Sequence, residues 1–110
     1  MSSVRTIDGA TYQAVIAEPL KTPGVARQLA AGATSASTEL TASCRFVTMR
    51  AVGADIRYAI GVGSQTANAS TSHFIANGER LDLAVPPGGS IGVIRAASTS
   101  GTLELSELLT

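Results

Sequence analysis

The chain has 110 residues, enough for one domain with a single hydrophobic core. Its eight basic and eight acidic residues balance, so it lacks the positive charge that binding to nucleic acid requires, and we expect no nucleic-acid partner. Its one cysteine cannot form an internal disulfide, and no apolar run reaches the roughly 20 residues that span a bilayer, so we expect no membrane partner either.

The start of the chain is weakly patterned. Residues 1–8 are polar with scattered apolar positions, which predicts an arm or a frayed end. Residues Ala10–Ala17 are compatible with a first strand. Pro19 and Pro23 cannot donate a hydrogen bond to a strand ladder, so they predict a loop.

The next segment has no clear periodicity. Residues Val25–Ala31 fit either a short strand or a helical turn. Residues Ala30–Ser37 consist only of Ala, Gly, Ser and Thr, a composition typical of a flexible connector. We therefore predict that residues 1–38 form an N-terminal arm or weakly patterned segment, and that residues 39–110 form a β-sandwich domain.

The clearest strand pattern lies in the middle of the chain. In Asp55–Ile60, apolar and polar residues alternate with the period of two that a half-buried strand requires. Arg45–Val52 carries apolar residues on both faces, which is typical of a more central strand. Gly53, between the two runs, permits the positive φ of a tight turn. The pattern predicts an antiparallel hairpin over residues 45–60.

Further short apolar runs follow, separated by turn-forming clusters. Asn77-Gly78 is a tight-turn signal, and Pro86–Gly89 ends a strand abruptly. About five or six strands from Cys44 onward, with no helical period, predict an all-β fold, an antiparallel β-sandwich or jelly roll. The expected strands after residue 70 are Ser72–Ile75, Glu79–Val85, Ser90–Ala96 and Leu103–Leu108.

The same alternation predicts the hydrophobic core. Truncating a buried leucine generally costs about 2–5 kcal/mol, so Leu83→Ala is expected to destabilise the fold by that amount. The side chains expected in the core are Phe46, Ile56, Tyr58, Ile60, Leu81, Leu83, Val85, Ile91, Val93, Leu103 and Leu105.

One glycine-rich loop and one histidine are candidates for a ligand-binding or catalytic site. Gly61–Ser64 resembles a phosphate-binding loop only in its glycines, because it lacks the lysine and the following helix. His73 is the one histidine, and a catalytic triad would have to combine it with a serine such as Ser70 or Ser72. No strand–turn–helix motif presents such a serine, so a structural or surface role for His73 is favoured. One histidine and Cys44 do not make a zinc site.

Cys44 and the carboxylates also favour structural roles. Cysteine is among the most frequently buried residue types, so Cys44 is interpreted as a small core residue. The pairs Glu79 with Asp82 and Glu104 with Glu107 could act as acid and base. Within alternating strands they are better interpreted as the solvated partners of the leucines. We therefore assign no catalytic, cofactor-binding or metal-ligating residue, and we expect no cofactor.

The second half of the chain resembles a group of small bacteriophage virion proteins. The resemblance rests on strand patterns in Ser72–Ile75, Gly78–Pro86, Ile91–Ala96 and Gly101–Leu108. It spans roughly Cys44 to Leu108 and includes no catalytic signature. Short chains rich in Ala, Gly, Ser and Thr are found among phage head and tail proteins.

The resemblance implies a structural subunit of a symmetric particle and not an enzyme. The first reading is a capsid decoration, or cement, protein that stabilises the phage head by contacts with the major capsid protein or other virion proteins. It would be a homotrimer located in the virion. Because the N-terminus lacks a signal-peptide pattern, we expect synthesis in the host cytoplasm. The alternatives are a tail or head–tail protein that binds a host glycan, and a small hydrolase that uses His73.

The N-terminal segment has a predicted role in assembly. Residues 1–38 contain few large apolar side chains to offset the entropy of ordering the backbone, so we expect neighbouring subunits to order them. Arg5 and Arg27 would then pair with acidic groups across the contact. The alternative is that Ala10–Ala17 is another strand of the same sandwich.

Overall fold

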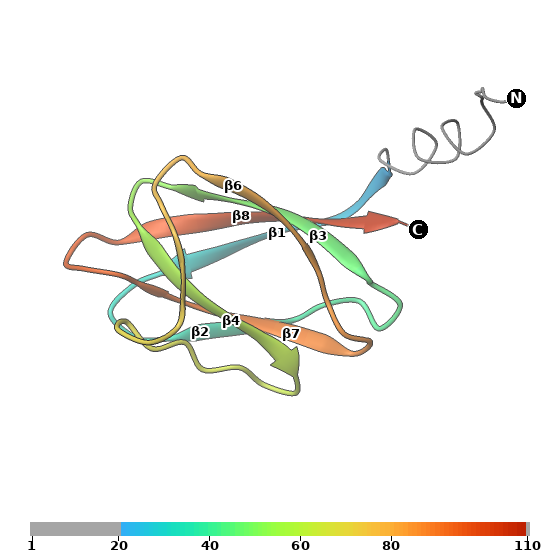
Figure 1. The fold of residues 1–110 in the computed structure, drawn as a ribbon, viewed down its shortest axis with the longest axis horizontal. Helices are drawn as coiled ribbons and strands as arrows, with labels where there is room; N and C mark the ends of the chain where they lie inside the picture. The colour runs from blue at the N-terminus through green and yellow to red at the C-terminus, as the bar shows by residue number, and fades with distance from the viewer. Residues whose placement is uncertain (1–20, 110) are drawn as a thin grey trace, which may run out of the picture.

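The computed structural model describes residues 21–109, which form two four-stranded antiparallel sheets packed face to face (Figure 1). All the regular elements in this part of the chain are strands. The prediction of an all-β sandwich is therefore confirmed. Within residues 21–109, no helix has the length and hydropathy needed to cross a membrane.

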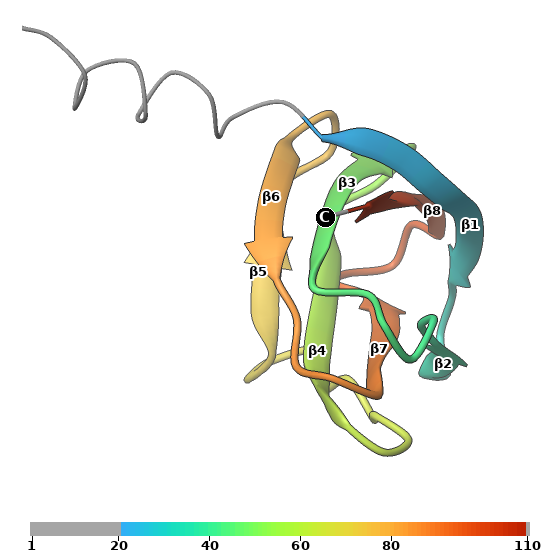
Figure 2. The ribbon, with the colours of Figure 1, turned by 90° about the vertical axis from the view of Figure 1, so that its right-hand side faces the viewer.

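The strand order is that of a jelly roll. Among strands that follow one another in the chain, only β4 and β5 are neighbours in one sheet, and every other connection crosses to the opposite sheet. Figure 2 shows the two layers from the end. The first sheet contains, in order, β1 (Thr22–Ala31), β8 (Gly101–Leu109), β3 (Phe46–Val52) and β6 (Arg80–Ala84); the second contains β2 (Ala36–Glu39), β7 (Gly89–Arg95), β4 (Ile56–Val62) and β5 (His73–Ile75).

The predicted hairpin over residues 45–60 is wrong, although both of its strands exist. β3 pairs with β6 and β8, whereas β4 pairs with β5 and β7 in the other sheet. Gly53 does adopt a positive φ of 91°, so the chain reverses there as expected. A glycine specifies the local turn, but it does not select the sheet in which the next strand finds its partner.

The turn predicted at Asn77-Gly78 is confirmed, but it also joins strands of different sheets. Gly78 has a φ of 85°, and the turn connects β5 to β6 across the two sheets. Asn77 Oδ1 accepts a hydrogen bond from the Gly53 amide at 2.9 Å, and the Asn77 amide donates to Asp55 Oδ1 at 2.8 Å. The two crossing turns therefore stabilise each other at one end of the sandwich.

The core lies between the sheets and contains most of the predicted residues. Ile60, Leu81 and Leu83 are only half-buried, at its margin. The prediction that Phe46 is a core residue is wrong. Val47 and Met49 point inward from β3, so the Phe46 side chain lies on the outer face of the sheet. There, Lys21 Nζ lies 4.9 Å from the centroid of the Phe46 ring. The confirmed core residues are Ile56, Tyr58, Val85, Ile91, Val93, Leu103 and Leu105, and those not predicted are Leu29, Ala31, Leu40, Val47, Met49, Ala51, Ala54, Ala67 and Ile75.

The described part of the predicted arm belongs to the sandwich. β1 runs along β8, and β2 runs along β7, so the arm prediction is wrong for residues 22–38, which contribute two strands and their connection to the sandwich. The stretch Val25–Ala31 is strand, with Leu29 and Ala31 buried. The small residues of β1 and β2 pair with β8 and β7 of the same chain. The predicted strand Ala10–Ala17 lies outside the described residues.

The loop between β4 and β5 covers the outer face of the second sheet. The Gln65 and Ala67 amides donate to Ser37 Oγ and Ser35 Oγ at 3.2 and 2.9 Å, so the loop is held across β2. Beneath it, β7 is buried on both faces, including Ser90 and Gly92. A Cβ atom at Gly92 would lie 2.5 Å from the backbone oxygen of Gln65. Glycine at this position therefore allows the close approach of the loop.

Gly92→Ala is expected to lower the free energy of unfolding by about 1–3 kcal/mol, because the methyl group must displace backbone atoms of the loop. Gly61→Ala is the matched control, since its Cβ would meet only the end of the Gln65 side chain, which can move. Urea denaturation of both variants measures the difference. Equal midpoints for the two variants would show that the loop does not press on β7.

Candidate functional site

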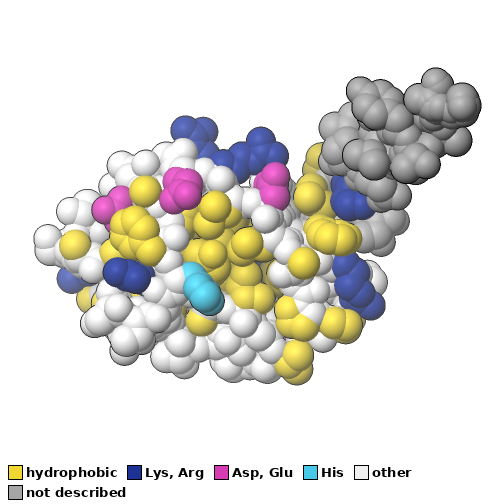
Figure 3. All heavy atoms as spheres, in the orientation of Figure 1, with side chains coloured by type: hydrophobic (Ala, Val, Ile, Leu, Met, Phe, Trp, Pro, Cys, Tyr) yellow, Lys and Arg dark blue, Asp and Glu magenta, His cyan; other side chains and the backbone are white. Residues whose placement is uncertain are grey.

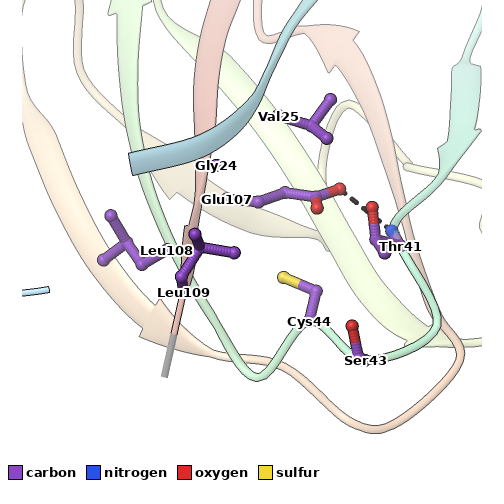
Figure 4. A pocket seen from close by; sticks show the side chains of 8 residues that line it. All are labelled: Gly24, Val25, Thr41, Ser43, Cys44, Glu107, Leu108 and Leu109. Carbon is purple, nitrogen blue, oxygen red and sulfur yellow. Dashed lines mark hydrogen bonds between the residues drawn. The ribbon is translucent and has the colours of Figure 1, made fainter. Parts of the chain in front are cut away.

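A cavity of about 450 Å³ opens at the end of the sandwich where β1 begins (Figure 4). It combines a buried carboxylate, the cysteine and exposed apolar side chains, with Val25 45% and Leu109 57% exposed. Its lining consists of Gly24, Val25, Thr41, Ser43, Cys44, Glu107, Leu108 and Leu109.

A bulge in β1 shapes this cavity. Pro23 pairs with Leu108, but Ala26 pairs with Ser106, so Gly24 and Val25 together oppose the single residue Glu107. A Cβ atom at Gly24 would lie 3.2 Å from both the Glu107 carbonyl oxygen and Leu109 Cδ2, which leaves little room for a side chain. The extra residue bends the edge strand around the end of β8.

Glu107 lies on the inward face of β8, in line with Leu103 and Leu105, and is 3% exposed. Its Oε2 accepts hydrogen bonds from Arg27 Nε and from the Thr41 amide, each at 2.9 Å. Burial by itself raises the pKa of Glu107, but the hydrogen bonds from Thr41 and Arg27 and the charge of Arg27 outweigh burial, so the net pKa lies below its ordinary value of 4.5. The carboxylate is therefore ionised and joins β1, β8 and the segment after β2.

These contacts correct two predictions. Arg27 pairs within its own chain, so it is not available to a neighbouring subunit's acidic groups in the way expected. Glu104 and Glu107 do not form a pair, because Glu104 points from the outer face of β8 and accepts a hydrogen bond from Gln28 Nε2 at 3.0 Å. Glu107 is buried and not solvated. The sequence signal for this was an acidic residue in phase with the two buried leucines of the strand.

Cys44 is a core residue, as predicted, with 6% exposure. Its Sγ donates to the Phe46 carbonyl oxygen at 3.4 Å. Burial raises the pKa of the thiol, and the nearby negative charge of Glu107 raises it further. Because the thiolate is the reactive form, this cysteine is poorly suited to nucleophilic chemistry.

His73 is exposed at the start of β5, where its ring centroid lies 5.4 Å from that of Tyr58. Ser72 lies beside it in sequence, but its hydroxyl oxygen accepts a hydrogen bond from the Asn68 amide and its carbonyl oxygen accepts one from Arg57. Of the two roles expected for His73, structural or surface, the structure shows the surface position, and none of the hydrogen bonds found among residues 21–109 places it in a triad.

His73→Ala is expected to change the free energy of unfolding by less than about 1.5 kcal/mol, the upper value for an aromatic pair beyond area burial. Tyr58→Leu is the companion variant, since it removes the same pair from the buried side. Thermal melts test the contribution of His73 to stability, and hydrolysis of a small ester tests its alternative role as a catalytic residue. A hydrolytic rate that disappears only in His73→Ala would support the enzyme alternative.

The remaining candidates are structural. Glu79 Oε1 accepts a hydrogen bond from the Ala76 amide at 2.8 Å, while Asp82 lies 3.5 Å from Arg80 on the exposed face. In the glycine-rich stretch, Gly61 belongs to β4 and the Gln65 amide is already bonded to Ser37. Residues 21–109 contain no group of three or more His, Cys, Asp or Glu side chains arranged to hold a metal ion.

The cavity therefore combines the largely buried Arg27–Glu107 ion pair with the exposed apolar side chains of Val25 and Leu109. Comparison with known protein families, with curated protein sequences and with solved structures returns no match to this chain.

Proposed function

We propose that this protein is a structural subunit of a phage particle, with capsid decoration as its first role. The observation that carries the proposal is the jelly-roll strand order of the two sheets. Jelly rolls recur in viral capsid proteins, although the same architecture also serves lectins and cupins, so the fold by itself does not determine function.

The packed interior supports a role in protein contacts. Met49, Ile91 and Leu103 meet between the sheets and are at most 1% exposed, so core side chains fill the space that an enclosed ligand would need. Large apolar side chains are instead exposed at the margins, including Val62 at 71% and Leu109 at 57%. Exposed side chains of this kind are available for burial against the major capsid protein or another virion protein. A homotrimer is the proposed assembly.

A second candidate is an adsorption protein of the tail that binds a host glycan. It is favoured by one feature, the exposed ring of Phe74, which is 46% exposed and carries the Arg57 guanidinium 4.9 Å from its centroid. An exposed aromatic face beside a donor-rich side chain can stack on a sugar ring. Glycan-array binding that is lost in Phe74→Ala and kept in His73→Ala would favour this candidate.

The decoration role is tested with particles from a culture that encodes the chain. Purified particles are expected to contain the protein in stoichiometric amounts by quantitative mass spectrometry, and particles made without its gene are expected to release DNA at a lower temperature. Recovery of the protein only in the particle-free fraction would contradict any virion role. Presence in particles with unchanged heat stability would favour the tail candidate.

A further inference from the structure

The turn between β5 and β6 contains an asparagine followed by a glycine, Asn77 and Gly78, and both residues are exposed. In such a pair the backbone nitrogen of the glycine can attack the side-chain amide carbon of the asparagine, because glycine has no side chain to obstruct the approach. The Gly78 nitrogen then bonds to Asn77 Cγ, its proton passes to water, and the side-chain nitrogen leaves as ammonia. Water opens the resulting succinimide ring to aspartate or isoaspartate, so the reaction needs no other reactant.

The folded turn holds the attacking nitrogen in place. The Gly78 amide donates a hydrogen bond to the Ala51 carbonyl oxygen at 2.8 Å, and Ala51 is fully buried. The Gly78 nitrogen must lose this proton before it can bond to Asn77. Attack in the folded state would therefore leave the Ala51 carbonyl without its donor, and an unpaired buried carbonyl is costly.

The residue that would be attacked is also held. Asn77 Oδ1 accepts a hydrogen bond from the Gly53 amide at 2.9 Å, and the Asn77 amide donates to Asp55 Oδ1 at 2.8 Å. These bonds fix both the side chain and the backbone of Asn77. The two reacting atoms can therefore turn toward each other only when the turn opens.

The part of the sandwich that carries this turn is weakly supported. Within residues 21–109, β6 pairs with β3 alone, and β5 pairs with β4 alone, so the β5–β6 side of the sandwich is left incomplete. Leu81 and Leu83 of β6 pack against the core but remain half-exposed. Figure 3 looks onto this side and shows hydrophobic side chains gathered beside His73. An edge strand with few buried contacts opens at a lower free energy than the core strands do.

We propose that Asn77 is a deamidation site whose reaction is controlled by opening of the β5–β6 turn. The reaction proceeds only during the fraction of time in which the Gly78 amide is released from Ala51. Isoaspartate lengthens the backbone by one carbon atom between the nitrogens of residues 77 and 78. The hydrogen bonds to Asp55 and Ala51 cannot then both form, so the product keeps the start of β6 open. The proposal concerns the chain's own chemistry and does not depend on the virion role.

Two measurements on the full chain test the proposal. Folded protein and protein unfolded in guanidinium chloride are incubated side by side, and peptide mass spectrometry follows the loss of Asn77. The folded rate is expected to be lower by about tenfold or more, and by the factor that hydrogen exchange gives for protection of the Gly78 amide, since both processes need the same opening. Equal rates in the folded and unfolded chains would overturn the proposal, as would a suppression that differs from the protection by more than about tenfold.

Asp55→Ala tests one of the hydrogen bonds that keep the turn closed. Losing the acceptor of the Asn77 amide should raise the folded rate by about two- to tenfold, the range for one hydrogen bond. Asp55→Asn is the matched control, since its side-chain oxygen can still accept the bond, and its rate should stay near that of the wild type. An unchanged folded rate in Asp55→Ala, or a rate that does not follow the exchange of the Gly78 amide, would contradict the proposal. If Asp55→Ala does not fold, the comparison of folded and unfolded wild type decides.

Discussion

Leu103→Ala is expected to lower the free energy of unfolding by about 2–5 kcal/mol, the range for a leucine whose removal leaves a cavity in a packed core. Leu103 is 0% exposed and lies on β8, which pairs with both β1 and β3. Few neighbours can move to fill the space. Chemical denaturation followed by the β-sheet dichroism signal measures the loss.

Leu83→Ala is the internal comparison for this prediction. The sequence pattern assigns it the same cost, but Leu83 is half-buried at the open edge of the first sheet, so we now expect a smaller loss than for Leu103→Ala. Equal losses for the two variants would mean that the β5–β6 side is covered in solution.

Arg27→Met is expected to lower the free energy of unfolding by about 3 kcal/mol near neutral pH, at the lower end of the cost of breaking a buried ion pair. The lower end applies because the Arg27 side chain is 25% exposed, whereas that of Glu107 is 4% exposed. The variant leaves Glu107 ionised and buried with one hydrogen-bond donor, the Thr41 amide. Adding Glu107→Gln should restore part of the loss, since the uncompensated charge is then gone.

The pH dependence provides an independent check on this ion pair. The pKa of Glu107 in the folded state lies below 4.5, so its contribution to stability is present above that pH and is lost as the pH falls through the folded-state pKa. The wild type should therefore lose stability on acidification by more than Glu107→Gln does. The cost of Arg27→Met should shrink over the same range, because without Arg27 the carboxyl takes up its proton at higher pH. Parallel curves for all three proteins would contradict a stabilising role for the pair.

The local features of this fold could be predicted because they depend on neighbouring residues. Alternation in Asp55–Ile60 identified β4, and the glycines at 53 and 78 marked chain reversals that the structure contains. Because the apolar residues from Cys44 onward do not recur with the period of a helix, the sequence predicted strands and no helices there. Each of these signals is a property of a few consecutive residues and their backbone preferences.

The candidate site could be predicted only in part. Cys44 was assigned to the interior from the general preference of its residue type, and it is buried. His73 was expected to be structural or at the surface, and it is exposed. The ion pair was missed because Arg27 and Glu107 are 80 residues apart in sequence and meet only where β1 bulges around β8. No local pattern reports which arginine lies opposite a buried glutamate.

The sequence by itself determined that this chain folds as antiparallel strands with apolar inner faces, since side-chain alternation and turn residues act over two to four positions. Only the tertiary structure decided which strands pair. Residues 22–39, weakly patterned in isolation, became β1 and β2 because β8 and β7 offer them partners with buried faces. In β3, where both faces are apolar, Val47 and Met49 face the core and Phe46 does not, because register with β6 and β8 sets the inward side. Pairing and register are set by contacts between distant segments, and those contacts exist only once the two sheets have come together.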